Sequence, residues 1–223
     1  MAIATSTSTP SQAGASSAEP AEQRVVFEQL DWTAYEQIVA ALGDSHTARL
    51  TYDRGTLEIV MPSEEHKTAA EWIAVFVRIL VEALGLELKS MGSTRLKYTA
   101  LQRGAEPDKA FYIQNALQVS GRKVQFETDP PPELVVEVDI THTDIDKNTF
   151  YASLGVPEFW RYNGKEIRFY HLQDRQYVEV EASPTFPYMP KARFYQFVAQ
   201  AQFGETQASK ALRTWIEEQA SWD

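Results

Sequence analysis

Apolar side chains recur at helical spacing most clearly after Ser63, in a long segment that runs to Gly85. Ser63 predicts the N-cap of a helix, and Glu64 and Glu65 favour its positively polarised first turn. Gly85 predicts the end of the helix. The side chains at this spacing predict one buried stripe: His66, Ala70, Ile73, Val77, Leu80 and Leu84. The stripe therefore begins with a polar residue.

Shorter patterns on either side predict an interleaved series of helices and strands. A helix is expected from Asp31 or Thr33 to Gly43, and a β-hairpin is expected around the turn at residues 53–55, with Leu57, Ile59 and Met61 on one face. Further strands are expected at 86–90, 94–99, 108–113, 133–140, 158–162, 166–172 and 176–181, and helices at 144–154, 191–202 and 206–219. This alternation predicts an α/β fold with a central mixed sheet flanked by helices.

The first 22 residues differ in composition from the rest of the chain. They consist largely of Ser, Thr, Ala and Pro, so they are expected to form a disordered tail ahead of one domain at residues 23–223. No apolar run approaches the length of about 18 residues typical of a membrane span. The N-terminus also lacks the Lys and Arg of a secretory signal, which favours a cytoplasmic protein with no membrane partner.

Composition then limits the chemistry. The chain has no cysteine, so disulfides, thiolate catalysis and cysteine metal sites are excluded. The net charge of −10 argues against a protein that binds duplex DNA tightly through charge alone. An acidic site filled by divalent cations is still compatible with this charge.

The segment "PELVVEVDITHTDIDK", residues 132–147, places acidic residues within a strand pattern. Alternation puts Leu134, Val136, Val138 and Ile140 on one face, and Glu133, Val135, Glu137 and Asp139 on the other. One interpretation is an edge strand whose second face lies in water.

A second interpretation depends on "RGAEPDKAFYI", residues 103–113. Glu106 and Asp108 are two residues apart, so they share one face if the strand begins early enough. If this strand neighbours 133–140, Asp108 and Glu137 can converge. Carboxylates brought together repel each other, and a hard divalent cation relieves that repulsion. Such a cation can activate water for phosphodiester hydrolysis, while Lys147, at the start of the next helix, can offer positive charge to the phosphate. His142 and Arg161 lie near this segment in the sequence.

Three motifs, "MGSTRLKYTALQRGAEPDKAFYIQN", "DPPPELVVEVDITHTDID" and "YASLGVPEFWRYNG", together resemble the Uma2 family of endonucleases, within the restriction-endonuclease-like PD-(D/E)XK superfamily. The resemblance covers about residues 30–215. It implies a four-stranded mixed sheet flanked by helices and a nuclease-type site that uses Mg²⁺ or Mn²⁺. A nucleic acid, with DNA ahead of RNA, is the expected substrate, although the motifs themselves do not specify one.

The resemblance also implies roles for individual residues. Asp108 matches the acidic residue of the first half of the motif, and Glu137 matches that of the second. Asp139 stands where the wider superfamily has lysine, which points to Lys147 as the replacement. Glu106 matches an additional metal ligand, and His66 or its neighbour Glu65 matches a site residue contributed by the first long helix.

Two classes of function follow. The first is a metal-dependent endonuclease in which Asp108 and Glu137, helped by Asp139 or Glu106, hold the metal. The second is a catalytically inactive nuclease fold that binds a partner or nucleic acid. A hydrolase of another phosphodiester would use the same site as the first class. A homodimer is common among nucleases that cut both strands, and the sequence does not decide the oligomeric state.

Overall fold

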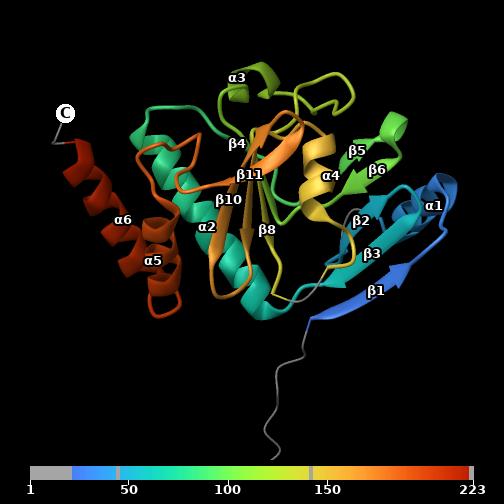
Figure 1. The fold of residues 1–223 in the computed structure, drawn as a ribbon, viewed down its shortest axis with the longest axis horizontal. Coiled ribbons are helices and arrows are strands. Elements are labelled where there is room, and N and C mark those ends of the chain that lie inside the picture. The colour runs from blue at the N-terminus through green and yellow to red at the C-terminus, as the bar shows by residue number, and fades with distance from the viewer. Residues whose placement is uncertain (1–21, 44–45, 141–142, 221–223) are drawn as a thin grey trace, which may run out of the picture.

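The computed structural model describes residues 22–43, 46–140 and 143–220. The tail predicted at residues 1–22 lies outside these ranges except for Glu22, and His142 lies outside them as well. The strands of the described residues form two sheets that lie side by side (Figure 1). Among these residues, no helix combines the length and apolar character that a membrane span requires.

The smaller sheet contains the predicted hairpin and is antiparallel throughout, in the order β1-β3-β2-β6-β5. Its strands are β1 (Gln23–Phe27), β2 (Arg49–Asp53), β3 (Thr56–Met61), β5 (Leu96–Tyr98) and β6 (Arg103–Ala105). The predicted N-terminal helix, α1 (Trp32–Leu42), packs Tyr35 against Leu50, Tyr52 and Leu57 of the hairpin. The 3₁₀ helix η1 (Thr99–Leu101) joins β5 to β6.

Burial in β3 does not distinguish its two faces. Leu57 is fully buried, but Met61 is 44% exposed. Glu58 and Val60, on the opposite face, are buried. Both faces of this strand are therefore covered, because Leu57 packs in the cluster that contains Tyr35 of α1, while Glu58 and Val60 line a small cavity beside β8 of the larger sheet.

The larger sheet is mixed, in the order β11-β10-β9-β8-β7-β4. Its strands are β4 (Lys89–Ser90), β7 (Lys109–Tyr112), β8 (Leu134–Val138), β9 (Glu158–Tyr162), β10 (Ile167–Gln173) and β11 (Gln176–Val180). Strand β8 runs parallel to β9, and the other pairs are antiparallel. The edge-strand interpretation of β8 is wrong, since it has a neighbour on each side and all five of its residues are buried.

Helices cover both faces of the larger sheet. On one face α2 (Glu64–Ala83) packs against β8 and α5 (Lys191–Ala201) packs against β10, while α6 (Glu205–Ala220) packs on these two helices; Leu134, Val136 and Val138 of β8 belong to the core on this face. On the other, Val135 packs with α4 (Lys147–Ser153). Figure 1 shows α4 between the two sheets, and the short α3 (Ala116–Val119) near one end of the larger sheet.

The long helix α2 begins where the sequence predicts, with Ser63 as its N-cap. The side chain of Ser63 accepts a hydrogen bond from the backbone N–H of His66. Its predicted stripe is buried except for Leu84, which is 40% exposed because it lies at the C-cap. The predicted α/β class with a central mixed sheet, an N-terminal helix and a β-hairpin is confirmed. The larger sheet has six strands here, where the resemblance implied four.

Candidate active site

Strand register explains why Asp108 and Glu137 converge. In the antiparallel pair of β7 and β8, Lys109 lies opposite Val136. Asp108 comes immediately before β7, and continuing this register by one residue sets it opposite Glu137. Both carboxylates are almost fully buried. The two motifs therefore meet at one end of adjacent strands.

A small cavity surrounds this point, and both sheets contribute to its walls. The larger sheet and its helices provide five of the predicted site residues: His66, Asp108, Glu137, Asp139 and Lys147. The smaller sheet provides Arg49, Thr51 and Glu58 from β2 and β3. The cavity is thus lined by α4, the hairpin of β2 and β3, and the end of β8.

Helix α4 places two donors on one carboxylate oxygen of Glu137. Asp146 caps the helix by accepting hydrogen bonds from two backbone N–H groups. Lys147 and Tyr151 follow, four residues apart and so on the same face. The ammonium of Lys147 lies 3.0 Å from Glu137 Oε1, and the Tyr151 hydroxyl donates to the same oxygen. Lys147 also donates to Thr51 Oγ1, at 3.2 Å, which connects the site to the smaller sheet.

The charges in the cavity are strongly coupled. Burial raises the pKa of Glu137 most; Lys147 lowers it and the negative charges of Asp108 and Asp139 raise it further, to about 7. Burial alone would lower the pKa of Lys147, but the carboxylates of Glu137, Asp139 and Glu58 outweigh burial and raise it. Lys147 is therefore a buried cation at neutral pH, held by the carboxylates around it.

Asp108 is held by helix α2. Its Oδ1 lies 2.7 Å from His66 Nε2, and its Oδ2 accepts a hydrogen bond from the backbone N–H of Val138. Burial would raise the pKa of Asp108, but the His66 hydrogen bond and charge lower it overall. His66 Nδ1 contacts Glu22 at 2.7 Å. Burial lowers the pKa of His66, yet the hydrogen bonds to Asp108 and Glu22 raise it to about 9, so the ring is protonated at neutral pH.

Asp139 lines the cavity but is paired with another residue. Its Oδ2 accepts from Arg161 Nε at 2.9 Å, and Arg161 belongs to the neighbouring strand β9. The residue at the superfamily's lysine position is therefore an acid paired with an arginine. The ammonium that lies beside Glu137 comes from Lys147, at the start of α4.

Glu106 lies outside this cluster. Its Oε2 accepts from the backbone N–H of Leu50, and its Oε1 lies 2.7 Å from Arg95 and 3.4 Å from His46. It lines a second cavity together with these two residues. Glu65 is exposed on α2 and does not line the cavity that holds Asp108 and Glu137.

The structure adds residues that the sequence did not single out. Tyr151 could have been found from its spacing of four residues after Lys147. Glu58 is 1% exposed and accepts from Thr143 Oγ1 and the backbone N–H of Asp144, so it anchors the segment that leads into α4. Thr51 and Arg49 gave no sequence signal, because they reach the site only through the packing of one sheet against the other.

The donor set suits a hard divalent cation that keeps several water ligands. Mg²⁺ and Mn²⁺ prefer oxygen ligands and are often held by one or two carboxylates. Asp108 and Glu137 supply such oxygens, and both donors to Glu137 end on Oε1, away from Oε2. Within the described ranges, no group of three or more histidine or acidic side chains forms a ready metal site. The residues therefore fit an ion held by two carboxylates and water.

Comparison with protein families identifies the chain. A family model described as "Uma2: Putative restriction endonuclease" matches residues 32–196. The chain belongs to the Uma2 family. The match includes every element that builds the cavity except β1, and membership supports a nuclease-type function on nucleic acid. Restriction-endonuclease-like families generally use divalent metal ions. No curated protein matches the Uma2 chain.

Proposed function

We propose that this chain is a metal-dependent endonuclease that hydrolyses phosphodiester bonds of DNA. The observation that supports it most strongly is the cavity in which Asp108, Glu137 and Lys147 meet. Two carboxylates and one ammonium, buried at the end of adjacent strands, provide the charges that phosphoryl transfer requires. Asp108 and Glu137 hold Mg²⁺ or Mn²⁺, and Asp139 adds negative charge beside them.

Each residue has a separate task in this proposal. When bound, the divalent ion lowers the pKa of a water nucleophile and stabilises charge on the leaving oxygen. His66 holds Oδ1 of Asp108, while Lys147 and Tyr151 hold Oε1 of Glu137. Lys147 can also donate a hydrogen bond to a non-bridging phosphate oxygen that enters the cavity. The residues thus bind and orient the reactants.

Cleavage of plasmid and oligonucleotide DNA with Mn²⁺ or Mg²⁺ tests the proposal. We expect Asp108→Asn and Glu137→Gln each to lower the rate by about 100-fold or more, because a lost metal interaction costs several kcal/mol at the transition state. Asp174→Asn is the matched control, since Asp174 lies in the exposed turn between β10 and β11. Equal rates in wild type and all three variants would contradict the proposal.

A second candidate is a nuclease fold that binds nucleic acid or a partner without cleaving it. The ion pairs favour it, since Asp108, Glu137 and Asp139 each already contact a cationic side chain. Calorimetric titration with Mn²⁺ separates the two candidates. Binding that Glu137→Gln weakens supports the endonuclease, whereas no binding at millimolar Mn²⁺ supports the second candidate. A homodimer would serve either function and is tested by sedimentation.

A further inference from the structure

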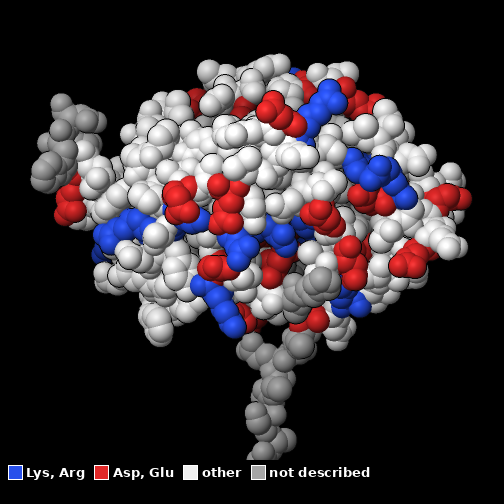
Figure 2. Space-filling view, in the orientation of Figure 1, with Lys and Arg blue, Asp and Glu red and all other residues white. Residues whose placement is uncertain are grey.

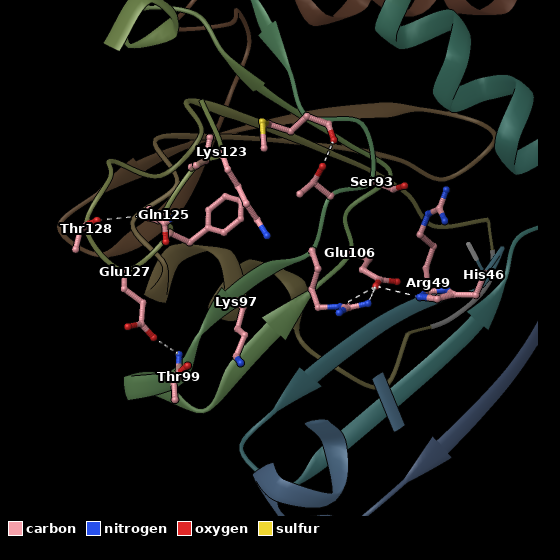
Figure 3. A pocket seen from close by; sticks show the side chains of 15 residues that line it. His46, Arg49, Ser93, Lys97, Thr99, Glu106, Lys123, Gln125, Glu127 and Thr128 are labelled. Atoms are coloured by element: carbon pink, nitrogen blue, oxygen red, sulfur yellow. Dashed lines mark hydrogen bonds and ion pairs between the residues drawn. The ribbon is translucent and has the colours of Figure 1, made fainter. Parts of the chain in front are cut away.

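A second cavity opens beside the candidate active site. Its volume is about 850 Å³, and its walls come from β2, from β5 and the segment before it, and from residues 123–128. Figure 3 shows that side chains enter it from opposite sides, with Lys97 on β5 facing the segment that carries Lys123 and Gln125. Neither the family description nor the proposed metal site accounts for this cavity.

Positive charge collects here in a chain that is acidic overall. Four cationic side chains, Arg49, Arg95, Lys97 and Lys123, line the cavity with only two carboxylates, Glu106 and Glu127. The whole chain has a net charge of −10. On the face shown in Figure 2, by contrast, basic and acidic side chains lie intermixed in a band. A local excess of positive charge in a hollow attracts anions.

Lys123 is the most available of these cations. Arg95 pairs with Glu106, and Lys97 pairs with Glu36 on α1. Lys123 is exposed and forms no ion pair with any residue in the described part of the chain. Its side chain extends toward the middle of the cavity (Figure 3).

Arg49 joins this cavity to the candidate active site. Its side chain lines both, and its Nε lies 3.7 Å from Asp108 Oδ1. That Nε is buried and has no hydrogen-bond acceptor among the described residues. A buried donor without an acceptor is costly, so an anionic oxygen at this position would be stabilising.

We propose that the cavity binds the sugar–phosphate backbone of a single strand that continues from the scissile phosphate, past Arg49, to Lys123. A cavity of this size holds roughly one or two nucleotides and is too small for a duplex. The partly buried ring of Phe126 lies in its wall and offers a surface for base stacking. This inference rests on the proposed function, which supplies the scissile phosphate beside Asp108.

Fluorescence anisotropy with the full chain in EDTA tests the inference without cleavage. The probe is a labelled single-stranded oligonucleotide, compared with the same sequence as a duplex. Lys123→Ala is the test variant, and Lys210→Ala is the control, because Lys210 is exposed on α6, away from the cavity (Figure 1). Thermal melting followed by circular dichroism checks that both variants fold like wild type.

We expect the single strand to bind more tightly than the duplex, and Lys123→Ala to weaken its binding. One lost phosphate contact lowers the salt slope by about 0.7, so a tenfold rise in KCl should weaken wild type about fivefold more than Lys123→Ala. Lys210→Ala should behave like wild type. A salt slope unchanged by Lys123→Ala, tighter duplex binding, or no single-strand binding would overturn the inference.

The result is separable from the test of the proposed function. Metal-dependent cleavage combined with binding that does not depend on Lys123 would overturn the cavity assignment and leave the endonuclease intact. Binding that depends on Lys123, without cleavage in any metal, would overturn the endonuclease and leave the cavity assignment intact.

Discussion

Replacing Lys147 with methionine tests whether the candidate site is a buried, charge-coupled unit. Lys147 is 5% exposed, and its Nζ lies 3.0 Å from Glu137 Oε1. At this distance and an effective dielectric constant of about 20, the gross attraction is roughly 5–6 kcal/mol. Removing one partner of a buried pair leaves an uncompensated charge. We therefore expect Lys147→Met to lower the free energy of unfolding by about 3–5 kcal/mol.

An exposed ion pair of the same length provides the control. Arg213 Nη1 lies 3.0 Å from Glu82 Oε2, with the two side chains 53% and 61% exposed. Because water screens such a pair, Arg213→Met should lower the free energy of unfolding by less than about 1 kcal/mol. Urea denaturation of both variants compares two pairs that differ mainly in burial.

A double variant shows where the cost arises. In the double variant Lys147→Met with Glu137→Gln, residue 137 carries a neutral carboxamide, so no buried negative charge is left without a cationic partner. Replacing both members of a buried pair is often close to neutral, so the double variant should be more stable than Lys147→Met alone by about 2 kcal/mol or more. If Lys147→Met costs no more than Arg213→Met, or if Glu137→Gln fails to rescue it, the reasoning about burial and charge is refuted.

Two further predictions concern other parts of the structure. Gly104→Ala should lower the free energy of unfolding by about 1–3 kcal/mol in urea denaturation, because the new Cβ would collide with the hydroxyl oxygen of the buried Tyr35 and lie 3.0 Å from its Cζ. Tyr35→Phe removes the hydroxyl and should restore part of the loss, and no rescue would count against a clash with the hydroxyl. Hydrogen bonds from Arg122 and the backbone N–H of Gln125 lower the pKa of Asp129 from 3.8 to about 2. Its stabilising contribution is therefore present above about pH 4 and lost as pH falls toward about 2. Thermal melting should show Asp129→Asn less stable than wild type at pH 7, with a much smaller difference at pH 2, whereas a difference as large at pH 2 as at pH 7 would contradict this.

The sequence predicted the part of the site that depends on strand and helix periodicity. Alternation along residues 133–140 placed Glu137 opposite the apolar face, and the following helix placed Lys147 close behind it. The structure brings both together with Asp108 because β7 and β8 are adjacent and in register. Periodicity alone could not reveal that β8 is an inner strand, since a buried polar face and a solvated one have the same pattern.

Glu106 shows where alternation fails. The spacing of two residues suggested that Glu106 and Asp108 share a face of one strand. In the structure β6 ends at Ala105 and β7 begins at Lys109, so both acids lie on the connection between the two sheets. Pro107 between them donates no ladder hydrogen bond. The two carboxylates therefore enter different cavities, one beside Arg95 and one beside His66.

The smaller sheet was the least predictable part of the fold. Strand β5 lies within the strand predicted at 94–99, but β1 was not predicted, and β6 has three residues, too few to show an alternating pattern. Strand β6 also pairs with β2 across about fifty residues of sequence, as in the contact of Ala105 with Thr51. Glu58, Thr51 and Arg49 reach the site only because this sheet packs over it, which explains why no local pattern pointed to them.

The central claim is that Asp108 and Glu137 together hold a divalent metal ion. The most direct test is a crystal of the protein soaked in Mn²⁺, with anomalous scattering used to locate the metal. We expect an anomalous peak within coordination distance of carboxylate oxygens from both residues, about 2.0–2.2 Å away. The peak should be absent from Glu137→Gln crystals treated in the same way. A peak elsewhere, or none at millimolar Mn²⁺, would contradict the claim.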